Sequence, residues 1–367
     1  MTHVQDPVGS LSRQIKCVIW DLDNTLWQGI LLEGDDVRPF PHIPKLLREL
    51  DERGILHSIA SKNEREPALE RLRSLGLEEY FLVPQIGWQP KSQSISRIAE
   101  ALNLGVESLA FVDDQAFERD EVTFSVPQVA CYAAEDSAAL AELPEFMPRF
   151  VTDDSARRRS MYQADLARQA VEADFEGPKD AFLASLGMRM TISPATEDDL
   201  QRVEELTVRT NQLNATGYTY SYETLRGFIR GGDHQLLVVE LEDRYGSYGK
   251  VGIALIDVRD GRRWLLKLLL MSCRVASRGV GNVLLGHIAN QARDRGVARL
   301  CAEFIKTDRN HLMYVTYRLA GFREAGQAGE AQLLEMPLDR RLDMPGYVEV
   351  VASGLSSSAG SQEVCHG

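Results

Sequence analysis

The stretch CVIWDLDNTLW at residues 17–27 decides the fold of the first part of the chain. Its four apolar residues CVIW (17–20) predict a short buried strand, and the carboxylates of Asp21 and Asp23 follow that strand directly. Four further apolar runs predict strands: LHSIAS (56–61), FLVP (81–84), LAFVDD (109–114) and VACY (129–132). Helical patterns that end in glycine separate several of these runs. This alternation predicts an α/β domain over residues 15–150 with a doubly wound parallel sheet, whose ligands bind beyond the carboxyl ends of the strands.

Two pairs of carboxylates lie at predicted strand ends. Asp21 and Asp23 end the first strand, and Asp113 and Asp114 end another. A strand-end aspartate on its own is commonly a turn residue or a helix cap. Two carboxylates two residues apart, however, can divide the work of a nucleophile toward phosphorus and of a general acid and base. Oxygen ligands from two strands also suit Mg²⁺, which binds a few carboxylates and completes its shell with water and phosphate oxygen.

A hydroxyl and an ammonium group lie between these pairs in the sequence. Ser61 ends a predicted strand and Lys91 follows in GWQPKSQS, and both groups are suited to holding phosphoryl oxygens. The ordered set resembles the haloacid dehalogenase (HAD) superfamily, which uses phosphoaspartate intermediates. By that resemblance Asp21 is the nucleophile and Asp23 the general acid and base. The resemblance also implies phosphate binding by Thr25, Ser61, Lys62, Asn63 and Lys91, and Mg²⁺ binding by Asp21, Asp23, Asp113 and Asp114.

The spacing of these residues predicts an open active site. About 35 residues separate Thr25 from Ser61 and about 30 separate Ser61 from Lys91, which leaves little room for a large cap domain. The next segment, residues 151–185, is charged, helical in pattern and broken by Gly-Pro at 177–178, so we expect a helical linker outside any core. The two ends of the chain, 1–14 and 341–367, are predicted to be largely disordered tails.

A second α/β domain is predicted over residues 186–340. Its long apolar strand WLLKLLLMSCRV (264–275) leads through the turn ASRGVGN (276–282) into a helical pattern. Glycines in such a turn let backbone N–H groups approach an anion at a helix N-terminus, although an ordinary strand-to-helix turn has the same pattern. Together with the helix, strand and helix that follow, the turn resembles the GNAT acyltransferase fold. That resemblance implies phosphopantetheine binding by Arg274, Arg278, Gly279 and Gly281.

Cys273 is predicted at the end of the long apolar strand. A lone cysteine on such a strand is commonly an inert core residue, but cationic neighbours and a following helix N-terminus are typical of reactive thiols. We therefore interpret Cys273 as a candidate catalytic nucleophile. The run TNQLN (210–214) closes a predicted helix and is either a helix cap with its loop or a polar surface for substrate. Its candidate substrate-binding residues are Asn211, Gln212 and Asn214.

The combination of DLDNTLW, SKN, TNQLN and SCRV resembles one group, the FkbH-like glyceryl transferase/phosphatases of polyketide biosynthesis. The resemblance implies an enzyme that takes the glyceryl group of 1,3-bisphosphoglycerate, removes its phosphates and leaves a thioester on the phosphopantetheine arm of an acyl carrier protein. A plain Mg²⁺-dependent phosphatase with a non-catalytic second half, and a carrier-docking scaffold without activity, are the competing interpretations. Acetylation of amines from acetyl-CoA is less favoured because it needs neither a thiol nucleophile nor a phosphatase partner.

Charge and cysteine content exclude other classes. The formal net charge of −13 opposes adhesion to nucleic acid or to anionic membranes. The polar start and the lack of a long apolar run predict a cytoplasmic protein that is not inserted in a membrane. Five scattered cysteines with no C-x-x-C pair argue against a disulfide framework and against a structural zinc site.

Overall fold

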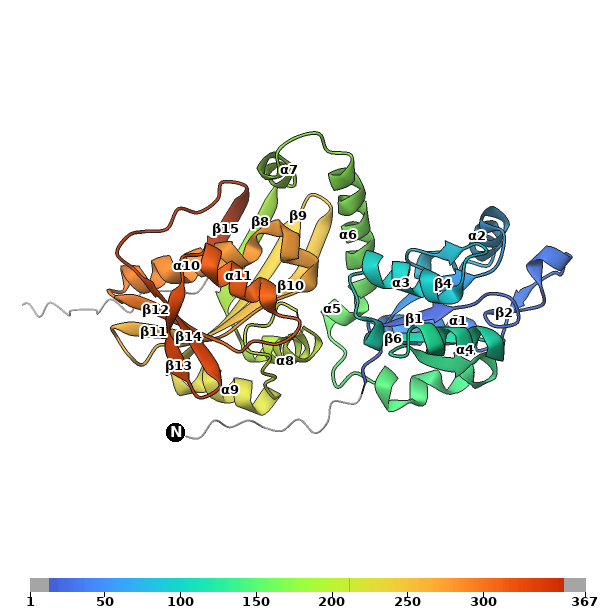
Figure 1. Ribbon diagram of the computed structural model, residues 1–367, viewed down its shortest axis with the longest axis horizontal. Helices are drawn as coiled ribbons and strands as arrows, with labels where there is room; N and C mark the ends of the chain where they lie inside the picture. Colours follow the sequence, from blue (N-terminus) through green and yellow to red (C-terminus); the bar gives the residue numbers. More distant parts are fainter. Residues whose placement is uncertain (1–12, 211, 353–367) are drawn as a thin grey trace, which may run out of the picture. The chain divides into compact units, whose positions relative to one another are not determined.

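The computed structural model describes residues 13–210 and 212–352, and the chain divides into two compact units, Met1–Asp174 and Phe175–Gly367 (Figure 1). The boundary falls inside the segment 151–185 that was expected to link two domains. Most of the predicted tails, residues 1–12 and 353–367, lies outside the described residues. Each unit is an α/β unit of the expected kind, and each is described below by itself.

The first unit is built on a five-stranded parallel sheet. The strand order is β5–β4–β1–β6–β7, with β1 in the centre, paired with β4 on one side and with β6 on the other. The strands are β1 (Cys17–Trp20), β4 (Leu56–Ser61), β5 (Gln85–Ile86), β6 (Leu109–Asp113) and β7 (Ala130–Ala133). The third predicted strand, FLVP, is wrong, because Phe81 forms only an isolated bridge with His57 and Val83 has a positive φ of 50°.

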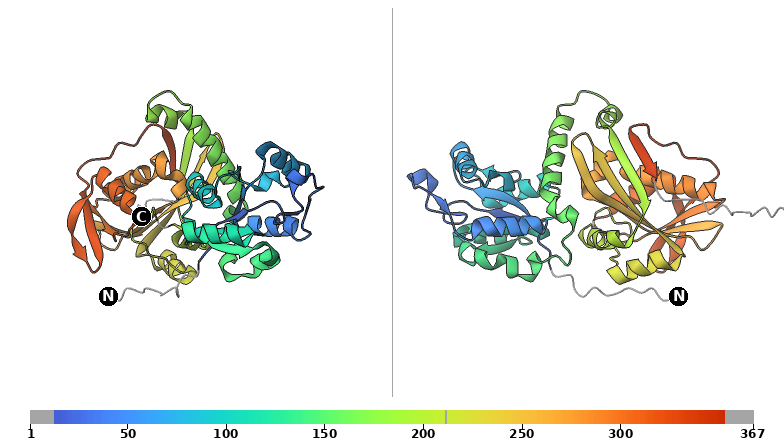
Figure 2. Two further views of the ribbon diagram at one scale, coloured as in Figure 1. Left: turned by 45° about the vertical axis from the view of Figure 1, so that its right-hand side comes forward. Right: turned by 180° about the vertical axis from the view of Figure 1, so that it is seen from behind.

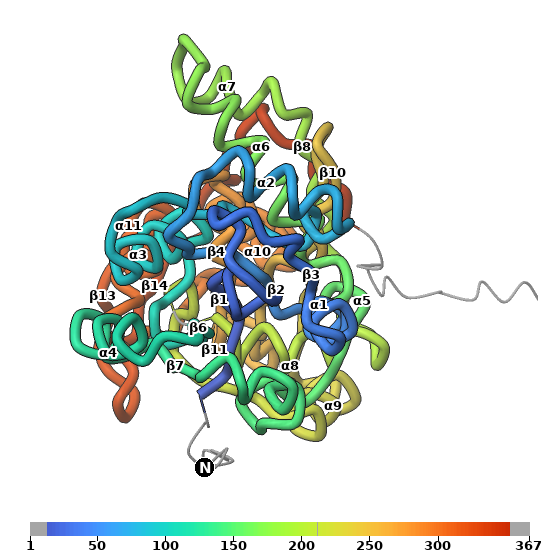
Figure 3. The backbone as a smooth tube through the Cα atoms, turned by 90° about the vertical axis from the view of Figure 1, so that its right-hand side faces the viewer, coloured from blue at the N-terminus to red at the C-terminus, as the bar shows by residue number. Residues whose placement is uncertain are grey.

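Helices cover both faces of this sheet, as a doubly wound fold requires. On one face α1 (Ile43–Glu52) and α2 (Arg65–Ser74) bury leucines in a core with β1 and β4, and on the other α3 (Lys91–Ala101) and α4 (Ala116–Ser125) form a second core (Figure 3). A small hairpin, β2 (Trp27–Gln28) with β3 (Arg38–Pro39), follows β1. The chain order reverses between β1 and β6, so their carboxyl ends flank the crevice where ligands bind in such folds.

The predicted linker is not a separate segment. Helices α5 (Asp153–Ala156) and α6 (Arg158–Ala173) belong to the first unit, where Tyr162 joins the core and Arg158 donates a hydrogen bond to the Gly54 carbonyl at 3.1 Å. Helix α7 (Lys179–Ser185) belongs to the second unit, and its Phe182 and Leu183 join that core. The burial of these apolar residues was not predicted because the segment 151–185 is rich in charged residues.

The second unit is built on an eight-stranded mixed sheet in the order β13–β14–β12–β11–β10–β9–β8–β15. Helices α7, α10 (Val280–Asp294) and α11 (His311–Leu319) cover one face, and α8 (Leu200–Arg209) and α9 (Tyr222–Gly231) cover the other (Figure 2). Helix α8 ends at Arg209, before the run TNQLN (210–214) that was expected to close it. The strands are β8 (Met188–Pro194), β9 (His234–Asp243), β10 (Gly246–Asp257), β11 (Arg263–Met271), β12 (Arg299–Phe304), β13 (Arg323–Ala328), β14 (Ala331–Pro337) and β15 (Val348–Ala352).

Strands β11 and β12 separate toward their carboxyl ends. They pair in parallel only from Arg263 to Leu266, although β11 continues to Met271. Residues 213–215 fill the gap between the separated strands. On one side Met271 N donates to Leu213 O at 2.9 Å and Ala215 N donates to Leu269 O at 3.0 Å, and on the other Ile305 N donates to Ala215 O at 3.0 Å. We call residues 213–215 the wedge segment.

Part of the predicted C-terminal tail is ordered. Residues 341–347, here called the strap, run along α10, where Asn290 exchanges two hydrogen bonds with the backbone of Leu342 at 2.9 and 2.8 Å. Strand β15 then pairs in parallel with β8 and becomes the edge of the sheet. The expectation of a tail from 341 onward was therefore wrong for residues 341–352.

Within the described ranges, no helix combines the length and the apolar character needed to cross a membrane.

Candidate functional site

The candidate site of the first unit lies at the carboxyl ends of β1 and β6. Asp21 follows β1 and its amide donates to the Val112 carbonyl at 2.9 Å, which places it beside Asp113 at the end of β6. One carboxylate oxygen from each of Asp21, Asp113 and Asp114 lies within 4.8 Å of the others. Adjacent parallel strands thus bring together residues about 90 positions apart in the sequence.

Lys91 holds two of these carboxylates together. It is the first residue of α3, its exposed fraction is 3%, and its ammonium donates to Asp21 Oδ1 at 2.5 Å, to Asp113 Oδ2 at 3.0 Å and to the Ala60 carbonyl at 2.8 Å. Burial alone would lower the pKa of Lys91, but the charges of Asp21 and Asp113 outweigh burial and raise it. All three N–H bonds of the ammonium go to protein oxygens, so it remains charged and aligns the two carboxylates.

Burial also changes the protonation of the acidic residues on β6. Loss of water around Asp113, reinforced by the nearby charge of Asp21, raises the pKa of Asp113 to about 6. The same two causes raise the pKa of Asp114. A bound cation would offset both effects, because it stabilises the ionised carboxylates.

Asp23 is held apart from this acidic group. Its Oδ1 accepts hydrogen bonds from Trp27 Nε1 at 2.8 Å and from Leu31 N at 3.1 Å, and its Oδ2 accepts one from Asn63 Nδ2 at 2.9 Å. The structure therefore does not bring the Asp23 carboxylate into the group that could hold a metal, contrary to the expectation that it is a ligand there. Three donors instead fix the orientation of this carboxylate, which follows the nucleophile candidate Asp21 by two residues.

The other residues expected to bind phosphate have protein partners as well. Thr25 Oγ1 accepts from Asp114 N at 3.0 Å and so joins the loops after β1 and β6. The Lys62 ammonium pairs with the buried carboxylate of Glu118. Asn63 orients Asp23, and Ser61 is buried at the end of β4. Asn63 thus takes a positioning role here, and Thr25 and Lys62 fix the surroundings of the site.

The acidic group fits Mg²⁺ by its chemistry. Three carboxylates from two strand ends offer hard oxygen ligands, and two of them have pKa values that burial and like charge raise. Asp21, Asp113 and Asp114 are the residues that would hold the ion. Asp21 is also the candidate for attack on phosphorus, and the hydrogen bonds to Asp23 orient that carboxylate for proton transfer.

Cys273 lies after the long strand of the second unit and not on it. Strand β11 ends at Met271, Ser272 N donates to the Val251 carbonyl at 2.6 Å, and Cys273 begins the 3-10 helix η7 (Cys273–Arg278). The thiol is half-buried. The expectation of a strand-end position was wrong because the chain leaves the sheet two residues earlier.

The strap covers the turn that was expected to hold phosphopantetheine. Gly279 has φ +71° at the start of α10, and a Cβ built there would lie 2.2 Å from the Tyr347 hydroxyl. Arg278 is 2% exposed, and its guanidinium lies 5.5 Å from the centre of the Phe182 ring. Arg274 is half-buried, and Gly281 lies against Thr316. In this structure the glycine at 279 makes room for a side chain of the chain itself.

Two of the candidate substrate residues of TNQLN, Gln212 and Asn214, lie within the described residues and differ in burial. Asn214 is buried in the wedge segment, where its Nδ2 donates to Tyr218 O at 3.2 Å and its Oδ1 accepts from the amides of Thr216 and Gly217 at 3.1 and 2.9 Å. These bonds close its own loop, so the expectation that Asn214 contacts substrate is not supported by its geometry. Gln212 is exposed, and Asn211 lies outside the described residues.

Sequence reasoning missed several residues that shape these sites. Trp27, four residues after Asp23, orients that carboxylate, and Arg119 donates to the Asp113 carbonyl at 2.7 Å. In the second unit Asn310, with no exposed surface, donates to Asn214 O at 3.0 Å and to Ile305 O at 2.8 Å and thereby fastens the wedge segment. The spacing of Trp27 within DLDNTLW was a usable signal, whereas nothing local indicated Arg119 or Asn310.

Comparisons with known proteins match parts of the chain. The family model of haloacid dehalogenase-like hydrolases matches residues 25–120. Human magnesium-dependent phosphatase 1 is 25% identical over 169 residues, which are 41% of this chain and 95% of that protein. A crystal structure of the N-terminal part of a Bacteroides fragilis protein, containing a phosphatase domain complexed with Mg, is 30% identical with a TM-score of 0.31 and covers 35% of this chain and 39% of that one.

Solved acetyltransferases are similar to the chain as well. The ribosomal-protein-S18-alanine N-acetyltransferase of Escherichia coli is 20% identical with a TM-score of 0.33, covering 41% of this chain and 95% of that one.

The residues matched by the family model of haloacid dehalogenase-like hydrolases begin just after Asp23. They include Ser61, Lys91, Asp113 and Asp114. Over residues 25–120, the first unit of this chain is therefore similar to haloacid dehalogenase-like hydrolases.

Proposed function

We propose that the first unit hydrolyses phosphate monoesters with Mg²⁺. We propose further that the second unit transfers the dephosphorylated acyl group to the phosphopantetheine thiol of an acyl carrier protein. The family resemblance described above identifies this acyl group as glyceryl. The observation that carries the proposal is the buried set of Asp21, Lys91 and Asp113, together with the carboxylate of Asp23, two residues after Asp21, which three hydrogen bonds orient. The match to haloacid dehalogenase-like hydrolases and the magnesium-dependent relative support the first half. The half-buried thiol of Cys273 supports the second.

The residues of the first unit have separate tasks in this reaction. The Asp21 carboxylate attacks phosphorus and the phosphate ester bond breaks, while Asp23 gives a proton to the leaving oxygen. Asp23 then takes a proton from water, which attacks the phosphoaspartate and releases phosphate. Lys91, which hydrogen-bonds Asp21 and Asp113, aligns the Asp21 carboxylate for its attack on phosphorus. Mg²⁺, when bound, supplies positive charge opposite the phosphoryl oxygens.

The second unit is proposed to handle the acyl group. The Cys273 thiolate attacks the acyl carbon of an acyl phosphate, the bond from carbon to the phosphate oxygen breaks, and phosphate leaves. The carrier thiol then attacks the resulting thioester, its proton is lost to solvent, and Cys273 is released as a thiolate. A phosphorylated glycerate such as 1,3-bisphosphoglycerate contains both the acyl phosphate and the phosphate monoester that the two units require.

A phosphatase with a non-catalytic second unit is the alternative, and one observation favours it. Tyr347 occupies the space at Gly279 that an incoming phosphopantetheine would approach. This alternative predicts phosphate release without a carrier protein and no effect of Cys273→Ala.

Intact-protein mass spectrometry separates the two proposals. The enzyme and a phosphopantetheinylated carrier are incubated with Mg²⁺ and 1,3-bisphosphoglycerate made in situ, with Asp21→Asn and Cys273→Ala in parallel. We expect a dephosphorylated glyceryl adduct on the carrier, which is lost with Cys273→Ala and keeps its phosphate or is absent with Asp21→Asn. Phosphate release that persists with Cys273→Ala, without any adduct, would favour the alternative.

A further inference from the structure

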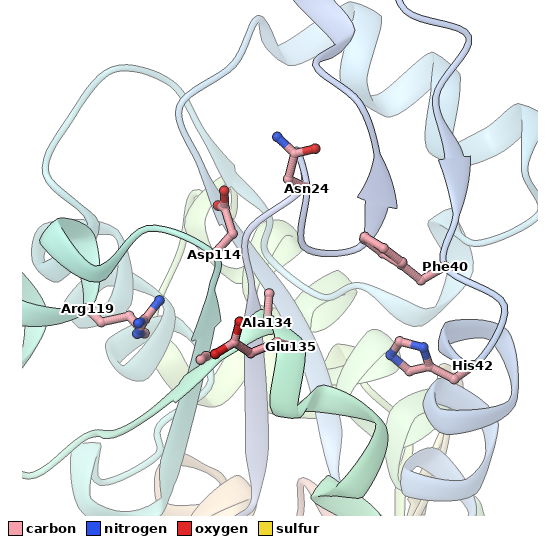
Figure 4. A pocket seen from close by; sticks show the side chains of 8 residues that line it. Asn24, Phe40, His42, Asp114, Arg119, Ala134 and Glu135 are labelled. Atoms are coloured by element: carbon pink, nitrogen blue, oxygen red, sulfur yellow. The ribbon is translucent and has the colours of Figure 1, made fainter.

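Helix α4 contacts three segments that carry residues of the candidate site. It follows β6 closely, so its first turn lies at the carboxyl edge of the sheet. The three contacts are those of Glu118 with Lys62, of Arg119 with the Asp113 carbonyl, and of Glu121 with Ser92. Figure 4 shows Arg119 beside the pocket of about 330 Å³ that shares Asp114 with the acidic group. About one turn of α4 therefore connects segments that are far apart in the sequence.

The contact between Glu121 and Ser92 caps the start of α3. Pro90, at the N-cap position of α3, has no side-chain oxygen that could accept a bond from the first turn. Glu121 takes this role from the neighbouring helix, since its Oε2 accepts from Ser92 N at 3.1 Å and its Oε1 accepts from the Ser92 hydroxyl. Ser92 is 7% exposed, so loss of these acceptors from a buried N–H and a buried hydroxyl is costly. Glu121 therefore fixes the backbone at the start of α3.

This backbone carries the buried ammonium of the site. Lys91 precedes Ser92 and is the first residue of α3. The far end of the Lys91 side chain is held by Asp21, Asp113 and the Ala60 carbonyl. In the proposed reaction, Asp21 loses its negative charge when its carboxylate becomes a phosphoaspartate. The position of the ammonium then depends more on the backbone from which it extends.

We propose that Glu121 is a positioning residue of the phosphatase site, which holds Lys91 in place through Ser92 and the first turn of α3. This inference rests on the proposed phosphatase function and adds to it a residue outside the strand-end motifs. Displacing an aligning group by about 1 Å can cost about 100-fold in rate, even when the altered residue lies away from the reacting atoms. A carboxylate on the next helix can therefore control the rate without touching the substrate.

Steady-state hydrolysis of 4-nitrophenyl phosphate by the full chain with Mg²⁺ tests the proposal. We expect Glu121→Ala to lower kcat at least tenfold and to change KM less than threefold, because alignment is lost while the groups that bind phosphate remain. Glu121→Gln keeps an oxygen that can accept from Ser92 N, so its kcat should stay within about threefold of the wild type. Asp120→Ala, an exposed acid on the same helix, is the matched control and should change neither constant. A fall with Glu121→Gln as large as with Glu121→Ala would overturn the role assigned to the hydrogen bonds.

Val122→Ala separates positioning from a general loss of stability. Val122 is buried in the core that α4 shares with α3, and its truncation should lower the melting temperature at least as much as Glu121→Ala does. At a temperature where both variants are folded, kcat of Val122→Ala should stay near that of the wild type. Equal falls in kcat in the two variants would show that Glu121 has only a structural role.

Binding of beryllium fluoride, an analogue of the phosphoryl group on aspartate, gives a readout without turnover. Fluorine NMR with Mg²⁺ present should show an affinity at least tenfold weaker in Glu121→Ala than in the wild type. Hydrogen exchange in a peptide covering 88–96 should accelerate with Glu121→Ala and not with Asp120→Ala. If the wild type neither hydrolyses the ester nor binds the analogue, the proposed function fails, and the exchange still decides whether Glu121 fixes the start of α3. Unchanged exchange in Glu121→Ala would overturn the inference whatever the activity.

Discussion

The two units use their motif residues in opposite ways. In the first unit the motif residues meet at the carboxyl ends of strands beside an open pocket, and buried charges pair with one another there. In the second unit, residues of the chain itself occupy the positions where a ligand was expected: Tyr347 lies against Gly279, and the wedge segment fills the gap between β11 and β12. The comparison teaches that a motif of charged residues predicts a site more safely than a motif of glycines and amides, because glycine and asparagine also serve to close a fold.

The largest expected effect concerns the charge pairing in the first unit. Lys91→Met removes the cation between Asp21 and Asp113, and breaking a buried ion pair typically costs about 3–5 kcal/mol because it leaves an uncompensated charge. We expect phosphate release to fall at least 100-fold. Hydrogen exchange of peptides from β1 and β6, followed by mass spectrometry in EDTA, should accelerate, and Mg²⁺ should restore part of the protection by binding the folded state.

Lys62→Met is the control for this prediction. Lys62 also pairs with a buried carboxylate, that of Glu118, but the Lys62 side chain is 37% exposed, so solvent screening makes the expected loss of stability smaller than for Lys91. Exchange in β1 and β6 should stay near that of the wild type. Equal acceleration in both variants, or protection by Mg²⁺ in neither, would contradict the assignment of Lys91 as the aligning cation.

The sequence sufficed for the first sheet and its acidic ends because both depend on local pattern. Apolar runs followed at once by Asp21 or by Asp113 and Asp114 indicate strand and site together, and parallel pairing brings those ends to one edge. The short β5 escaped prediction, since Phe81–Pro84 has the apolar composition of a strand while Val83 adopts a positive φ. The strand propensity of the residues gives no information about such a change in backbone direction.

The rest was not predictable because it depends on contacts between distant segments. Nothing near Tyr347 indicates that it packs on Gly279, 68 positions earlier, and the run 341–347, with Pro345 and Gly346, shows neither a helix nor a strand pattern. Asn214 was likewise ambiguous between loop and substrate surface. Its bonds to its own loop, and those of Asn310 to the wedge segment, appear only once β11 and β12 are seen to separate.

An intermediate effect is expected from the residue that fastens the wedge segment. Asn310→Ala leaves the carbonyls of Asn214 and Ile305 without this buried donor, which should destabilise the second unit by about 2 kcal/mol. Hydrogen exchange should accelerate in a peptide covering 213–220 and stay unchanged in β1 and β6. Asn282→Ala, at an exposed position of α10, is the control and should leave the wedge protected. Unchanged exchange in the Asn310 variant would show that the strand pairing alone holds the wedge.

The smallest effect is expected at the strap, and it sharpens the comparison most directly. Tyr347→Ala removes the side chain that lies against Gly279 and opens the start of α10, so binding of coenzyme A, used as a soluble carrier of phosphopantetheine, should strengthen up to about tenfold, the equivalent of about 1.4 kcal/mol. Tyr347→Phe keeps the ring but removes the hydroxyl that lies nearest to Gly279, so its affinity should fall between those of the wild type and of Tyr347→Ala. Isothermal titration calorimetry measures both. Weaker binding with Tyr347→Ala would make Tyr347 part of the binding site, and the second unit would then resemble the first, with its motif residues facing a ligand.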